Sequence, residues 1–249
     1  MTPLLIVQPD ATDPAGPLAD WLTEAGAELT VCRPFAEDQV PADLEGFSGL
    51  VVLGGAMGAL DDEQYPWLAK VRALLSSAVA NRVPTLAICL GAQLLAVATG
   101  GRVREMPEGA ESGPSLVAKR DAANQDPLWA ELPFTPDVIQ FHRDEITALP
   151  GSAQLLAAAP RCTNQAFRVG QSGYATQFHI ETTPRIVLDW AAEAPEGAAA
   201  ARAGTLDPEY LATVHEYLTE TWRPFAARFV RLAAGELEPA SSRISIPLV

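Results

Sequence analysis

The chain has 249 residues, 48% of them hydrophobic, so it can bury a full core in one large domain or in one domain with an appendage. Its 17 basic and 31 acidic residues give a net charge of −14, which argues against a nucleic-acid partner. The sequence has neither an apolar run of about 18 residues nor a charged segment leading into an apolar one at its start, so we expect a soluble cytoplasmic protein without a membrane partner.

Short apolar runs alternate with helical patterns in the first half of the chain. This alternation predicts an α/β fold with a mainly parallel central sheet and helices on both faces. Functional sites in such sheets lie beyond the carboxyl ends of the strands. The predicted elements are strands at 4–7, 28–32, 49–53 and 85–88, and helices at 18–25 and 67–80.

Gly54 and Gly55 follow the strand predicted at 49–53. Backbone without side chains can turn its N–H groups toward the oxyanion of a tetrahedral intermediate. The paired glycines lie at the carboxyl end of their strand, as does the cysteine that follows the strand at 85–88. This position supports a shared site.

Cys89 lies where the strand at 85–88 turns directly into a helix. Small residues flank it, Ala87 before and Gly91 after, and these permit a tight turn. The unpaired N–H groups and the dipole of the following helix favour a thiolate over a thiol. The spacing therefore predicts a reactive cysteine, with the N–H of Leu90 available to an oxyanion.

Residues 101–170 contain more prolines, many turns and short strands such as 138–141, which predict mixed or antiparallel additions that carry substrate-contacting loops. The sequence has neither a phosphate-binding P-loop nor a dinucleotide fingerprint, so no cofactor is expected. Cys32, Cys89 and Cys162 are an odd number without a CxxC pair, so neither a disulfide framework nor a metal site is expected.

His179 and Glu181 stand two residues apart. On an extended strand their side chains point to the same side, so the carboxylate can hold one ring nitrogen while the other faces a thiol. Together with Cys89, they would let the imidazole take the thiol proton, let sulfur attack an acyl carbon, and return the proton to a leaving amine.

The order Gly-Gly, Cys-Leu-Gly-x-Gln and His-x-Glu resembles the class I (triad) glutamine amidotransferases, and most closely the stand-alone branch similar to the glutaminase part of GMP synthase. The likeness covers roughly residues 4–190 and includes the stretches 61–68, 141–144, 149–151 and 162–168. It implies a flavodoxin-like fold. It also implies that Cys89 is the nucleophile, His179 the base and Glu181 its partner.

The same resemblance implies roles for residues around this triad. Ala87 and Ala56 depart from the family, which commonly has glycine and proline there. Losing a proline frees a φ angle, so the sequence leaves open whether the oxyanion loop is formed at rest; an unformed loop would give a low basal activity. The implied residues are Gly55 and Leu90 as oxyanion donors, and Gly54, Gln93, His142 and Asp144 around the substrate.

Three functions are compatible with these features. The first is hydrolysis of the γ-amide of glutamine through a γ-glutamyl thioester, with ammonia passed to a separate synthase subunit, because the sequence lacks a recognisable synthetase domain. The second is hydrolysis of a γ-glutamyl conjugate of an amine or a thiol. The third is a non-catalytic regulator that keeps the scaffold. Fold and triad alone do not specify the substrate.

After about residue 192 the composition shifts toward alanine and glutamate, and an amphipathic helical pattern begins after Asp207. Pro224 interrupts this pattern, which predicts a kink or a second helix. We therefore predict an amidotransferase-like domain at 1–192 and a C-terminal helical extension at 193–249, packed on that domain or on a partner. Residues 236–249 have too little pattern to predict more than a tail.

Overall fold

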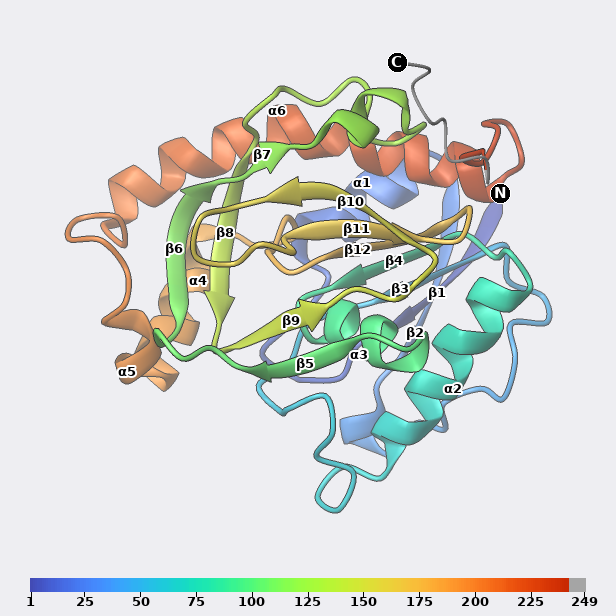
Figure 1. The fold of residues 1–249 in the computed structure, drawn as a ribbon, viewed down its shortest axis with the longest axis horizontal. Helices are drawn as coiled ribbons and strands as arrows, with labels where there is room; N and C mark the ends of the chain where they lie inside the picture. Colours follow the sequence, from blue (N-terminus) through green and yellow to red (C-terminus); the bar gives the residue numbers. More distant parts are fainter. Residues whose placement is uncertain (242–249) are drawn as a thin grey trace.

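The computed structural model describes residues 1–241, and an eight-stranded sheet lies at their centre (Figure 1). The strand order is β2-β1-β3-β4-β12-β11-β10-β7. The strands from β2 to β12 in this order run parallel, and those from β11 to β7 are antiparallel. The predicted mainly parallel α/β sheet is therefore confirmed. The strands are β1 (Thr2–Val7), β2 (Ala27–Cys32), β3 (Gly49–Val52), β4 (Thr85–Ile88), β7 (Ala118–Lys119), β10 (Ala153–Ala158), β11 (Ala166–Val169) and β12 (Gly173–Thr176).

Helices cover both faces of the sheet, as the alternation predicts. Within β1, Leu4 and Ile6 pack into the core shared with α1 and α6, whereas Leu5 and Val7 pack toward α2 and α3. None of the helices within residues 1–241 is long and apolar enough to cross a membrane. The helices are α1 (Gly16–Glu24), α2 (Trp67–Ala80), α3 (Leu90–Ala98), α4 (Pro184–Glu193), α5 (Pro195–Ala198) and α6 (Pro208–Ala233), with short 3₁₀ turns at Pro34–Ala36 and Asp121–Gln125.

The region 101–170 adds antiparallel structure beside the main sheet, in agreement with the sequence prediction. β5 (Arg102–Glu105) pairs with β9 (Asp144–Ala148), and β6 (Glu111–Leu116) pairs with β8 (Asp137–His142). The turn between β8 and β9 is a single residue, Arg143. Both strands therefore deliver their ends to the same place, beside the carboxyl ends of the parallel strands.

Helix α6 runs without a break through Pro224, so the alternative of a second helix starting there was wrong. A proline inside a helix removes one hydrogen bond, but buried apolar side chains on both sides, including Trp222 and Phe225, anchor this helix to the core. The indole of Trp222 also donates to the Asp137 carbonyl oxygen at 2.9 Å. The domain boundary near residue 192 stays a prediction, and the last part of the predicted tail, 242–249, lies outside the described residues.

Replacing Trp222 with alanine should lower the free energy of unfolding by about 3–5 kcal/mol, because the buried ring fills space between α6 and β8. Urea denaturation measures this change. Tyr217→Ala on the same helix is the control, since Tyr217 is 51% exposed and its loss should cost less than about 0.5 kcal/mol. An unchanged unfolding midpoint for Trp222→Ala would contradict the packing of α6 on this core.

Candidate active site

Cys89 occupies a strained turn between β4 and α3. Its backbone has φ of 50° and ψ of −107°, which is unusual for a residue with a side chain. Its N–H donates to the Thr176 carbonyl oxygen at 2.8 Å, which ties the turn to the end of β12. A Cβ atom at position 91 would lie 2.3 Å from the Val52 carbonyl oxygen, so Gly91 lets α3 start this close to β3.

His179 and Glu181 form the expected pair, with 2.7 Å between His179 Nδ1 and Glu181 Oε1. Both side chains are buried, and the second oxygen of Glu181 accepts the N–H of Ile180 at 2.8 Å. The extended strand expected to carry them ends earlier, at Thr176. His179 instead forms an isolated antiparallel bridge with Ile139, and this bridge holds the segment after β12 in place.

The charges around His179 favour its protonated form. Burial alone would lower the pKa of His179, but Glu181 and the sulfur of Cys89 act against it and raise the pKa well above its usual range. The Trp190 ring packs on the imidazole with 4.6 Å between ring centroids. The imidazole is therefore buried, oriented by a carboxylate and close to the Cys89 sulfur.

The paired glycines lie so close to the other site residues that a side chain would not fit at either position. A Cβ at Gly54 would lie 2.4 Å from Asp13 Oδ1 and 3.0 Å from His179 Cε1. One at Gly55 would lie 3.0 Å from the Leu90 side chain. The structure thus brings both glycines and Leu90 to the triad.

Ala56 stands where the family commonly has proline, and its backbone N–H has a role in the structure. It donates to Asp10 Oδ2 at 3.1 Å, and the other Asp10 oxygen accepts the N–H of Thr12 at 3.0 Å. A proline would have no hydrogen to donate. The loop is therefore held by a side chain from the segment that follows β1, a contact that the sequence analysis did not predict.

The remaining predicted substrate contacts lie on the β8–β9 side. The Gln93 side-chain amide donates to the Asp144 carbonyl oxygen at 3.2 Å and to Gln177 Oε1 at 3.3 Å. The His142 ring nitrogens are both within hydrogen-bond distance of protein atoms, Asp144 O on one side and Glu111 on the other. Substrate contact by these residues stays a prediction.

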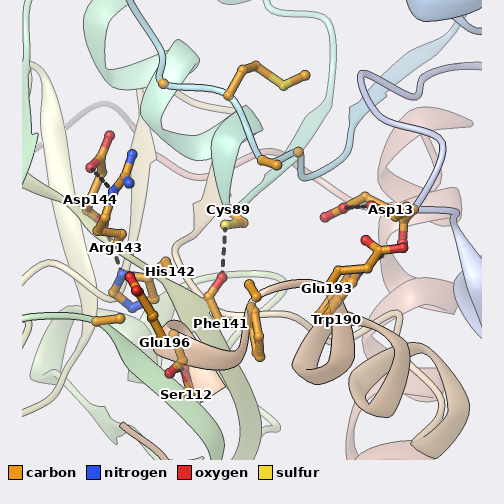
Figure 2. A pocket seen from close by; sticks show the side chains of 18 of the residues that line it. Asp13, Cys89, Ser112, Phe141, His142, Arg143, Asp144, Trp190, Glu193 and Glu196 are labelled. Atoms are coloured by element: carbon orange, nitrogen blue, oxygen red, sulfur yellow. Dashed lines mark hydrogen bonds and ion pairs between the residues drawn. The ribbon is translucent and has the colours of Figure 1, made fainter. Parts of the chain in front are cut away.

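A cavity of about 820 Å³ opens over Cys89. Figure 2 shows Cys89 between Asp13 on one side and the β8–β9 turn on the other, with the Phe141 carbonyl oxygen 4.0 Å from the sulfur. Helix α5 contributes one wall, which Ser112 Oγ anchors through a 2.7 Å bond to the Gly197 carbonyl oxygen. The cavity is lined by Asp13, Gly55, Ala56, Met57, Cys89, Gln93, Glu105, Ser112, Phe141, Arg143, Asp144, His179, Trp190, Glu193 and Glu196, among others.

Asp13 and Trp190 are site residues that the sequence analysis missed. Asp13 lines the cavity but is only 7% exposed, and this burial, together with the charges of Asp10 and Glu181, raises its pKa to about 7 against the opposing effect of His179. Its position after β1 was a usable signal, because sites gather at the carboxyl ends of parallel strands. Trp190 lies on α4 with its indole donating to Thr12 O at 2.8 Å, and no motif marks it.

Comparison with known proteins agrees with this geometry. The family "glutamine amidotransferase class-I" matches residues 17–186. This chain belongs to that family. A solved glutamine amidotransferase from Methylobacillus flagellatus superposes with a TM-score of 0.80 at 28% identity, covering 97% of each chain. The flavodoxin-like fold implied by the resemblance is thus confirmed at the level of the family.

Two relatives of this class I amidotransferase carry different names. One is the glutamine-hydrolysing GMP synthase of Christiangramia forsetii, 29% identical over 157 residues, or 62% of this chain and 29% of the relative. The other is gamma-glutamyl peptidase 3 of Arabidopsis thaliana, 27% identical over 150 residues, or 59% of each protein. The chain therefore spans less than two thirds of either relative.

Changing Asp13 to asparagine should reveal the energetic cost of its buried carboxylate. Its pKa of about 7 lies above the ordinary value of 3.8, so the folded state holds the proton more tightly and wild-type stability falls as pH rises from 4 to 7. Relative to wild type, the variant should gain up to about 4 kcal/mol of unfolding free energy between pH 4 and pH 8. Chemical denaturation at both pH values measures the difference. Asp20→Asn, at an exposed position on α1, is the control, and equal pH profiles for wild type and Asp13→Asn would contradict the expectation.

Proposed function

We propose that this chain hydrolyses the γ-amide of glutamine with Cys89 as the nucleophile, and that the ammonia passes to a separate synthase. The observation that carries the proposal is the 2.7 Å contact between His179 Nδ1 and Glu181 Oε1, at the base of the cavity that contains the Cys89 sulfur. This contact fixes the imidazole with its other nitrogen available to the thiol.

In the first step, His179 holds the thiol proton and the sulfur attacks the δ-carbon of the substrate, which forms a tetrahedral oxyanion. The backbone N–H groups of Gly55 and Leu90 stabilise the negative oxygen. His179 then gives the proton to the leaving nitrogen, the C–N bond breaks, and ammonia departs from a γ-glutamyl thioester on Cys89. The raised pKa of His179 means that it carries this proton until the amine needs it.

In the second step, water attacks the thioester carbonyl while His179 accepts a proton from that water. The same oxyanion donors act again, the C–S bond breaks, and glutamate leaves. Glu181 keeps the imidazole in position and balances its charge through both steps. The chemistry therefore consumes one water and returns Cys89 to its starting state.

A separate synthase is supported by the share of GMP synthase that this chain matches. The match covers 29% of the Christiangramia forsetii protein, so most of that enzyme has no counterpart in the aligned region. Ammonia made at Cys89 would then need an acceptor site on another protein or on another domain. The oxyanion loop, held through Asp10 and Ala56, is the segment that such a partner would adjust.

A second candidate is hydrolysis of γ-glutamyl conjugates, and the cavity size favours it. At about 820 Å³, the cavity is as large as pockets that hold drug-sized ligands, so a leaving group larger than ammonia has room along α5. The lining carboxylates of Glu193 and Glu196 favour a leaving group that bears an ammonium group. The one arginine of the lining, Arg143, already lies near Glu105 at 3.8 Å.

The test is glutamate release by the purified wild-type protein from glutamine, from γ-glutamyl diamines and from γ-glutamyl amino acids. We expect turnover that Cys89→Ala reduces by at least about 1,000-fold, as for the loss of other catalytic nucleophiles. Cys32→Ala is the matched control, because Cys32 is also buried but lies at the end of β2, outside the cavity.

The substrate profile separates the two candidates. Release of glutamate from glutamine supports the amidotransferase hypothesis. Release of glutamate from conjugates alone supports the hypothesis of a γ-glutamyl conjugate hydrolase. A glutamine analogue with an electrophilic carbon in place of the γ-amide should alkylate Cys89 in either case, as detected by peptide mass spectrometry. Full activity in Cys89→Ala, or alkylation that avoids Cys89, would refute both.

A further inference from the structure

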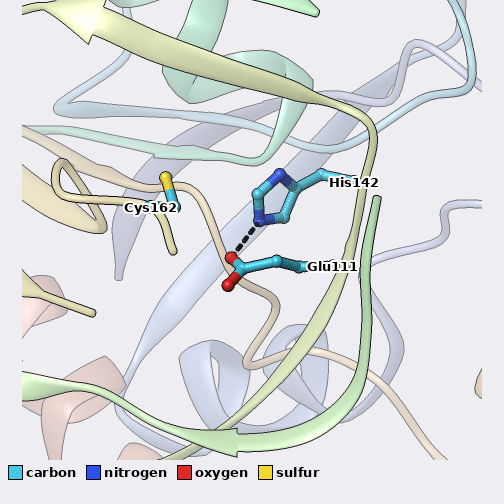
Figure 3. Close-up of side chains that lie close together, drawn as sticks. All are labelled: Glu111, His142 and Cys162. Carbon is cyan, nitrogen blue, oxygen red and sulfur yellow. Dashed lines mark hydrogen bonds and ion pairs between the residues drawn. The ribbon is translucent and has the colours of Figure 1, made fainter. Parts of the chain in front are cut away.

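A second group of side chains lies against the cavity, which His142 also lines, and the proposed mechanism does not use it. Figure 3 shows Glu111 from β6, His142 from β8 and Cys162 from the β10–β11 connection converging on one point. One ligand atom from each lies within 4.8 Å of the others, and all three residues are buried. The first two are direct partners in the β6–β8 ladder, so the pairing itself sets their side chains together.

Both ring nitrogens of His142 lie near hydrogen-bond acceptors. Nδ1 lies 2.9 Å from the Asp144 carbonyl oxygen, which can only accept, so this nitrogen carries a hydrogen. Nε2 lies 3.1 Å from Glu111 Oε2 and 3.0 Å from Gln140 Oε1. An imidazole held through Nδ1–H to a carbonyl, with Nε2 toward a carboxylate and a sulfur, has the orientation of a metal-ligating histidine.

The surrounding polar groups form a supporting layer. Gln165 Nε2 donates to Glu111 Oε2 at 3.0 Å, which orients the carboxylate. Burial and the carboxylate of Glu111 raise the pKa of the Cys162 thiol to about 12, against a hydrogen bond from the Asn164 backbone, so without a cation the sulfur stays protonated. Gln165 Oε1 is a buried oxygen with no hydrogen-bond partner among the described residues, so the cluster contains an acceptor whose donor or cation is not accounted for.

We propose that Glu111, His142 and Cys162 bind one divalent cation of the zinc class. One sulfur, one nitrogen and one oxygen ligand match the preference of zinc, and Gln165 Oε1 is the candidate for a fourth ligand. On binding, the thiol releases its proton and any proton on His142 Nε2 is also released. A thiolate, a carboxylate and a neutral imidazole then balance the charge of one M²⁺ ion, which suits a buried site.

The role of this cation would be to fix the wall of the catalytic cavity. His142 follows Phe141, whose carbonyl oxygen lies 4.0 Å from Cys89 Sγ, and it precedes the turn to Asp144, whose carbonyl oxygen accepts from Gln93. A bond from His142 to a metal also held by Cys162 would join β8 to the β10–β11 connection. The site is therefore structural, and its occupancy should change stability more than the chemistry at Cys89.

Cobalt(II) is a suitable probe because it takes zinc sites and its thiolate bonds absorb in the near ultraviolet. The experiment uses the full-length Cys89→Ala protein, so that the catalytic thiol contributes no signal. We expect one equivalent of Co²⁺ to give a sulfur-to-cobalt band, and Zn²⁺ to remove it by displacement. Cys162→Ser in this background should abolish the band, whereas the matched control Cys32→Ser should keep it.

A second variant keeps the proposal testable if Cys162→Ser folds poorly. Glu111→Gln retains the thiolate and nearly the same shape, so the band should persist while Zn²⁺ affinity, measured by competition with a chromophoric chelator, falls by at least about 10-fold. Zn²⁺ should also raise the thermal midpoint of the Cys89→Ala protein but not that of its Cys162→Ser derivative. A band that survives Cys162→Ser, or Zn²⁺ affinity equal in all variants, would overturn the proposal. Because every arm lacks Cys89, none of these outcomes depends on the proposed hydrolysis.

Discussion

The hydrogen bond from the Cys89 N–H to the Thr176 carbonyl oxygen is the contact on which the site depends. This hydrogen bond lies at the end of the pairing between β4 and β12, in which Ile88 is the partner of Thr176. Because these two parallel strands end level with each other, the turn at Cys89 and the segment carrying His179 emerge side by side. Gln177 and Cys89 are 88 residues apart in the chain and still in contact. Cys89 and His179 therefore come together only when the long-range pairing of the sheet forms, and long-range pairing slows folding.

Local sequence chemistry accounts for the features that could be predicted. The alternation of apolar runs was sufficient for the parallel strands, and small residues around Cys89 were sufficient for the sharp turn. The spacing of His179 and Glu181 predicted their contact, although an isolated bridge with Ile139, and not a regular strand, holds them. A regular strand and an isolated bridge can both place residues two apart on the same side. The predicted contact was therefore correct, although the predicted strand was not.

The features that could not be predicted depend on tertiary packing. Asp13 approaches His179 across Gly54, and Trp190 covers the imidazole from a helix that follows the triad. The group of Glu111, His142 and Cys162 comes from three separate segments, and none of the spacings between them matches a metal motif. The carboxyl groups of Asp13 and Glu181 both lie near the His179 imidazole, and two negative charges there would repel each other. The raised pKa of Asp13 removes this repulsion at mildly acidic pH, because Asp13 keeps its proton.

Helix α5 lines the cavity but lies outside the part of the chain that the family model matches. The family match ends at residue 186, but Trp190 and the wall from Glu193 to Gly197 come after it. Within the described residues, that wall contacts α4, β6 and β8, and Ser112 on β6 holds it by a hydrogen bond to the Gly197 carbonyl oxygen. Insertions or exchanges in this short segment would change the lining of the cavity and leave the turn at Cys89 in place. Sequence change in this segment therefore alters the shape of the cavity without altering the strands that carry Cys89.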